Sequence, residues 1–94
     1  MKKSDLEKVK EDGLDLQFAK KQTEQICLIA VKQNGNALYY VKKQTPEICL
    51  EAVKVCGSAL QHVKEQNLEI CLEAVKQHGG ALRFVNEEFK YLFK

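Results

Sequence analysis

Residues 47–63 read EICLEAVKVCGSALQHV, and nearly the same phrase occurs at residues 25–41 and 69–85. The three copies follow one another at a period of 22 residues. Each copy has a glycine at the same position, and a further glycine extends the spacing toward the start of the chain: Gly13, Gly35, Gly57 and Gly79. Self-similarity at a fixed period of this size indicates an array of stacked structural repeats.

Each repeat is predicted to contain two short helices. In the middle copy the first helix runs from about Glu47 to Val55, and its apolar side chains cover an arc of about 200°. Such a wide arc is typical of a helix that contacts its partner helix and both neighbouring repeats. Pro46 stands at the first helical position, where its missing N–H costs nothing. The residues expected to cap these first helices with a side-chain oxygen are Thr23, Thr45 and Asn67.

The glycines are predicted to end the first helices in the left-handed conformation, which glycine adopts without a Cβ penalty. Asn36 and Ser58 follow the glycine directly, and we expect them to cap the second helices. The second helix of the middle copy is predicted over about Ala59 to Glu65. Helices this short are marginal in water, so stacking on their neighbours must stabilise them.

The predicted fold class is therefore all-α: a short α-solenoid of antiparallel helix pairs with a 22-residue repeat. Residues 1–94 form a single helical-repeat domain in this interpretation. Its parts are an N-terminal capping unit, three full repeats and a C-terminal helical extension or cap, at residues 1–22, 23–44, 45–66, 67–88 and 89–94.

The two ends depart from the repeat pattern. Ser4 and Glu7 have the spacing of a capping box, and Lys8 replaces the alanine found at this position in every full repeat. This first helix is therefore predicted to cap the array and to have a polar outer side. At the other end, Phe89 replaces the capping Thr or Asn, so the last second helix is expected to continue with Leu92 and Phe93 on its apolar face.

The cysteines are predicted to be structural. Cys27, Cys49 and Cys71 recur in the apolar stripe, as small buried hydrophobes do, and neighbouring helices lie too far apart for disulfides. Cys56 falls in an otherwise polar column and is expected to be more accessible. The sequence contains no zinc-ligand spacing, catalytic triad, paired carboxylates or phosphate-binding glycine loop. We therefore expect no enzyme, no metal and no cofactor.

Two columns of side chains are candidate interaction surfaces. One lysine recurs in every unit at a position near the end of the first helix, where it is favoured by the helix dipole: Lys10, Lys32, Lys54 and Lys76. Stacked lysines could contact phosphates, but Glu51 and Glu73 stand three residues before a lysine, which favours a solvated face. The outer column of the second helices varies in type between repeats. The complete candidate set is Tyr39, Gln61, Arg83, Lys32, Lys54, Lys76, Phe89, Leu92 and Phe93.

Composition and net charge limit which cellular compartment and which class of partner the sequence suggests. The 94 residues carry a net charge of +2, which by itself implies neither nucleic acid nor an anionic membrane. No signal peptide is visible and the longest apolar run, residues 26–31, is far too short to span a membrane. Four cysteines without a secretion signal favour a reducing cytoplasmic location.

The phrase EICLEAVK-x-x-G-x-AL-x-x-V resembles the tandem repeats of the family called domain of unknown function 4116. The similarity covers about residues 14–86. The resemblance implies a repeat protein of the kind found in giant DNA viruses and some microbes, with no established activity, cofactor or catalytic residue. A viral source would place the protein in the host cytoplasm.

The predicted function is a non-catalytic scaffold or protein-interaction module with an unknown protein partner. The alternative is a weak nucleic-acid-binding protein that uses the lysine column. Because Phe89, Leu92 and Phe93 would forgo roughly 1.5–3 kcal/mol each in water, we also expect the tail to cap the last repeat and to contribute a homodimer contact.

Overall fold

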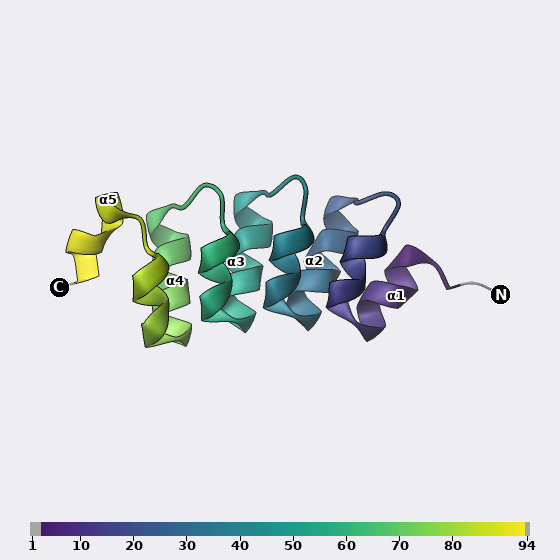
Figure 1. Cartoon of the computed structure of the whole chain (residues 1–94), viewed down its shortest axis with the longest axis horizontal. Helices are drawn as coiled ribbons and strands as arrows, with labels where there is room; N and C mark the ends of the chain where they lie inside the picture. Colours follow the sequence, from purple (N-terminus) through teal and green to yellow (C-terminus); the bar gives the residue numbers. More distant parts are fainter. Residues whose placement is uncertain (1–2, 94) are drawn as a thin grey trace.

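The computed structural model describes residues 3–93, and every regular element in that range is helical. Short helices stack side by side along one axis, so the molecule measures 54 × 20 × 15 Å (Figure 1). α-Helices form one layer and 3₁₀-helices the other, with the longer loops along one edge of the array. The predicted all-α array of stacked helix pairs is confirmed.

The elements alternate regularly along the chain. The α-helical layer consists of α1 (Asp5–Glu11), α2 (Glu24–Gln33), α3 (Pro46–Val55) and α4 (Leu68–Gln77). The 3₁₀ layer consists of η1 (Gly13–Phe18), η2 (Gly35–Tyr40), η3 (Gly57–His62) and η4 (Gly79–Phe84). A short α5 (Glu87–Lys90) and η5 (Tyr91–Phe93) follow.

The starts of the α-helices lie where the side-chain caps predict. The Thr45 hydroxyl accepts a hydrogen bond from the Ile48 backbone N–H at 3.2 Å, and Pro46 is the first helical residue. Thr23 and Asn67 cap α2 and α4 in the same way. These bonds satisfy backbone donors that a helix start leaves without an intrahelical partner.

The predicted left-handed caps at Gly35, Gly57 and Gly79 are wrong, since no glycine among residues 3–93 has a positive φ. The residue before the glycine ends the α-helix instead, in an extended conformation, and the glycine begins the 3₁₀-helix. Asn36 is therefore not the cap of the second helix; the Asn34 side chain accepts a hydrogen bond from the Asn36 N–H at 3.0 Å. Ser58 has no capping role either, because Cys56 occupies the cap position of η3.

The glycines are needed for close packing between repeats. A Cβ atom placed on Gly35 would lie 2.5 Å from the carbonyl oxygen of Ala52 in the next repeat, nearer than real Cβ contacts come. Gly13 and Gly57 meet the carbonyl oxygens of Ala30 and Ala74 in the same manner. Glycine thus lets one repeat press its turn against the backbone of the next.

A glutamine that the sequence analysis did not single out ties neighbouring loops together in each full repeat. The Gln44 side-chain amide donates to the His62 carbonyl at 2.8 Å, and its oxygen accepts from the Lys64 N–H at 3.0 Å. Gln22 and Gln66 make the equivalent bonds to the repeats that follow them. Each glutamine therefore connects the loop before an α-helix to the end of the following 3₁₀-helix.

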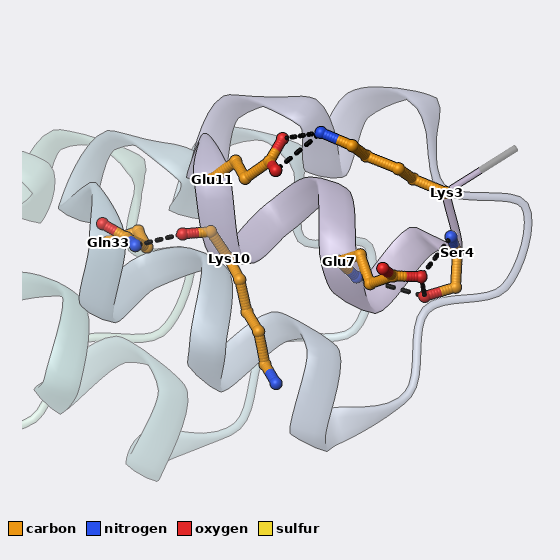
Figure 2. Close-up of polar contacts among 6 residues, drawn as sticks. All are labelled: Lys3, Ser4, Glu7, Lys10, Glu11 and Gln33. Atoms are coloured by element: carbon orange, nitrogen blue, oxygen red, sulfur yellow. Dashed lines mark hydrogen bonds and ion pairs between the residues drawn. The ribbon is translucent and has the colours of Figure 1, made fainter.

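The predicted capping box is confirmed, and α1 carries further polar contacts (Figure 2). Ser4 and Glu7 form both bonds of the capping box, and Lys3 pairs with Glu11 at 2.6 Å. The Gln33 amide of α2 donates to the Lys10 carbonyl. Within α1, Val9 is fully buried.

The expected continuation of the last second helix is wrong. η4 ends at Phe84, Val85 is extended, and a separate helix begins at Glu87. The physical cause is Gln66, whose side-chain oxygen accepts a hydrogen bond from the Asn86 N–H at 2.8 Å. This bond holds the chain in the same loop conformation as in the preceding repeats, so residues 81–93 do not share one helical face.

Candidate interaction surfaces

The outer column of the 3₁₀ layer is exposed along the whole array and consists of Gln17, Tyr39, Gln61 and Arg83. Tyr39 is the aromatic member of this column, and 67% of its surface is accessible. It borders a shallow groove of about 350 Å³ together with Leu14, Asn36, Tyr40 and His62. The Tyr39 ring meets Tyr40 edge-on at 5.1 Å and His62 at 5.2 Å. Burial lowers the pKa of His62, which favours the neutral form of its imidazole ring.

Gln61 and Arg83 do not line the Tyr39 groove. The Arg83 guanidinium lies 5.2 Å from the centre of the Phe84 ring, a cation–π distance. Among the described residues of the predicted outer column, Tyr39 is therefore the one that lines this aromatic groove.

The lysine column is exposed on the α-helical layer, away from the Tyr39 groove. Lys32, Lys54 and Lys76 are all exposed. Lys54 pairs with Glu51 at 3.5 Å, as predicted. The expected pair between Lys76 and Glu73 is not formed in the part of the chain that the structure describes. The column is therefore open to solvent and partly neutralised.

A second basic surface, missed by the sequence analysis, lies on the loop edge. A groove of about 580 Å³ is bordered by Lys20, Lys21, Lys42 and Lys43, with Glu24 as its acidic member. The corresponding groove one repeat later has a single lysine, Lys64, and a single glutamate, Glu65. The 22-residue period could have revealed these lysines, because Lys20, Lys42 and Lys64 share one column.

Within residues 3–93, the last helix pair exposes apolar side chains that are buried or less exposed in the earlier pairs. Leu72 and Leu82 are 49% and 37% exposed, whereas Leu60, the counterpart of Leu82, is fully buried. Phe89 and Phe93 are half-buried against the core, and Leu92 is 44% exposed. The structure therefore separates the three tail residues, with the phenylalanines packed and the leucine outward.

The recurring cysteines are buried and free, as predicted. Burial raises the pKa of the Cys49 thiol to about 11, and it raises the pKa of Cys27 and Cys71 as well. The Cys49 thiol donates to the Gln44 oxygen at 3.4 Å, which satisfies its hydrogen. Cys56 is partly exposed, also as predicted. Among residues 3–93, no three His, Cys, Asp or Glu side chains are grouped to hold a metal ion.

No helix in the described range is long and apolar enough to cross a membrane. A search of curated proteins and a search of solved structures give no match. A family model, Domain of unknown function (DUF4116), matches the chain twice, at residues 6–45 and 45–90. The two matches divide the array at the start of α3 and together cover most of the chain. The 22-residue helix pairs and this double match show that the chain belongs to the DUF4116 family.

Proposed function

We propose that the protein is a non-catalytic helical-repeat module that binds another polypeptide through its 3₁₀ layer. The observation that carries this proposal is the exposed Tyr39 ring beside the groove formed with Tyr40 and His62. Tyrosine offers a large apolar contact area with a polar tip, and aromatic side chains are enriched at protein interfaces. The groove is shallow and open to solvent, which suits a side chain presented by a partner better than a substrate that must be enclosed.

A reducing cytoplasmic location suits this proposal. Three thiols are buried and unpaired in the core, and Cys56 is free and partly exposed. An oxidising compartment would favour intermolecular disulfides through Cys56. If the source is a virus, the corresponding compartment is the host cytoplasm.

Site-specific photo-crosslinking tests the proposal. A benzophenone amino acid replaces Tyr39 on the 3₁₀ layer or, as the control, Lys32 on the α-helical layer, and each protein is expressed in its native host. We expect a discrete polypeptide adduct from position 39 and none from position 32. The Tyr39→Arg variant should lose the same partner in co-purification and keep its thermal stability, because the ring is mostly exposed. Equal adducts from both positions would refute the assignment to this face.

Nucleic-acid binding is the second candidate, and the loop-edge groove favours it more than the lysine column does. Four lysines around one groove could contact several phosphates, whereas Lys54 in the column is already paired. We measure anisotropy of a labelled single-stranded RNA at 50 and 150 mM salt. Binding that falls about tenfold in Lys21→Glu/Lys43→Glu, but not in Lys32→Glu, would support this candidate. Of these two substitutions, Lys43→Glu gives the first groove the acidic residue that Glu65 supplies one repeat later.

A further inference from the structure

Successive repeats join through the same interface each time. The α-helix of one repeat presents a stripe of residues four apart to the repeat before it, and in α3 this stripe is Ile48, Ala52 and Cys56. The Ala52 carbonyl lies against Gly35, the Cys56 Cβ lies close to the same glycine, and Ile48 borders the loop groove of the preceding repeat. Ala30, Ala52 and Ala74 are all fully buried, so this contact has no space for a longer side chain.

The first helix cannot offer this stripe to a neighbour. The equivalent positions of α1 are Ser4, Lys8 and Asp12, all polar. The Ser4 side chain already makes hydrogen bonds within the capping box (Figure 2). The Asp12 side chain accepts a hydrogen bond from the Leu14 N–H. A lysine at the alanine position would place its long chain in a contact that leaves no room for it.

The last repeat, in contrast, displays the receiving half of the interface. Gly57 is enclosed by Ala74 and His78 of the next repeat, while no atom of the described residues lies within 4 Å of a Cβ placed on Gly79. Val53 is fully buried, while its counterpart Val75 is only partly buried. Helices α5 and η5 do not cover Gly79, although Phe89 and Phe93 of these helices pack against the core. We call Leu72, Val75, Gly79 and Leu82 the end face.

We propose that the end face binds an amphipathic α-helix carrying an Ile-x-x-x-Ala stripe, donated by another repeat-bearing polypeptide. The end face continues an interface that this chain already forms between its own repeats, and that interface specifies the partner helix. A second copy of this chain does not supply it, because the α1 helix has Lys8 in place of the alanine. The inference rests on the proposed polypeptide-binding function but concerns a different face from Tyr39.

Gly79 provides a precise probe of this surface. Its φ is negative, so alanine meets no backbone strain there, and the added Cβ meets no atom of the described residues. A helix docked as Ala74 docks on Gly57 would bring its alanine carbonyl into collision with that Cβ. Gly79→Ala should therefore block docking while leaving the free protein folded and as stable as the wild type.

The experiment titrates ¹⁵N-labelled protein with a synthetic peptide of residues 45–66, acetylated and amidated, in the presence of reductant. We expect amide shift changes centred on Leu72, Val75, Gly79 and Leu82. The dissociation constant should rise at least tenfold with Gly79→Ala protein. The matched control peptide carries Ala52→Lys, which copies the Lys8 arrangement, and it should bind at least tenfold more weakly than the parent peptide.

Three outcomes would overturn the inference: no shifts on the end face at millimolar peptide, shifts unchanged by Gly79→Ala, or equal binding of the Ala52→Lys peptide. Sedimentation of the free protein tests the remaining possibility, which is that a second copy of this chain covers the end face. A dimer that Gly79→Ala dissociates would assign the end face to a second copy and contradict the proposed partner. Crosslinking from position 39 is independent of all these results, so the failure of either proposal can be recognised separately.

Discussion

Gly57 and Gly79 occupy the same position of the repeat but meet different surroundings. A Cβ on Gly57 would collide with the Ala74 carbonyl, whereas the space at Gly79 is open. Gly57→Ala should lower the free energy of unfolding by about 1–3 kcal/mol, the usual cost of overpacking. Gly79→Ala should change it by less than about 0.5 kcal/mol, as exposed substitutions do. Urea denaturation of both variants measures the difference, and equal stabilities would contradict the packing account of these glycines.

The Gln44 side chain makes hydrogen bonds to two backbone groups and one thiol. Gln44→Leu removes these bonds and leaves the His62 carbonyl and the Lys64 N–H without this partner. Two lost hydrogen bonds to the backbone, at about 0.5–1.5 kcal/mol each, should lower the free energy of unfolding by about 1–3 kcal/mol. Gln61→Leu, on the exposed outer column, is the matched control and should change stability little. Similar effects of the two substitutions in thermal melts would show that the loop connection is unimportant.

The thiols should react in an order set by burial. Because the raised pKa values of Cys27, Cys49 and Cys71 leave less thiolate at a given pH, these residues should resist alkylation in the folded protein. Cys56 is the partly exposed thiol and should be labelled first. Mass spectrometry after brief iodoacetamide treatment at pH 8 gives the order. Labelling of Cys49 as fast as Cys56 would mean that the core opens readily.

At the scale of elements, the α-helix starts follow directly from the sequence, and the second helices follow only in part. A capping side chain accepts a hydrogen bond from a backbone N–H only three residues later, so the pattern is local in the sequence. Thr45 and Asn67 therefore mark the starts of α3 and α4. The length and type of the second helices depend on the Gln66 and Gln44 bonds, which join residues about 20 positions apart. The role of Gly57 depends likewise on Ala74 of another repeat. Local propensity carries no information about such contacts.

The two caps assigned from local patterns make this distinction measurable. Thr45 caps α3, whereas Ser58 lies inside η3 and caps nothing. Thr45→Ala should cost about 1 kcal/mol in the free energy of unfolding. Ser58→Ala should cost less than about 0.5 kcal/mol, in line with a substitution away from any cap. Chemical denaturation of both variants at one pH is sufficient, and a larger loss from Ser58→Ala would contradict the observed helix boundaries.

Some features of the candidate surfaces could likewise be predicted from the sequence, and others could not. Periodicity identified the exposed columns of Tyr39 and Lys54, since each recurs at a fixed position of the repeat. It did not identify the groove beside Tyr39, which requires Leu14 from one repeat and His62 from another. The end face was equally hidden, because Leu72 and Leu82 match the core pattern and only the absence of cover distinguishes them.

At the scale of the whole molecule, the homodimer contact expected from the tail stays a prediction. Phe89 and Phe93 contact the core, which leaves Leu92 and Tyr91 as the exposed apolar part of the tail. If the tail joins two chains, Leu92→Ser should shift the sedimenting species from dimer to monomer with little change in melting temperature. Phe89→Ser/Phe93→Ser should lower the melting temperature as well, because these rings pack internally. A wild-type monomer at all concentrations would exclude the dimer contact.

The fit between a glycine turn and the alanine of the following helix also bears on how such a chain can change in length during evolution. Every internal unit carries both the glycine and the alanine of the interface between repeats. An in-frame duplication of any 22 residues, such as 45–66, therefore inserts a unit that matches both neighbours. An in-frame deletion of the same length rejoins two units that already fit. The gene can therefore gain or lose units in single recombination events without selecting new core residues.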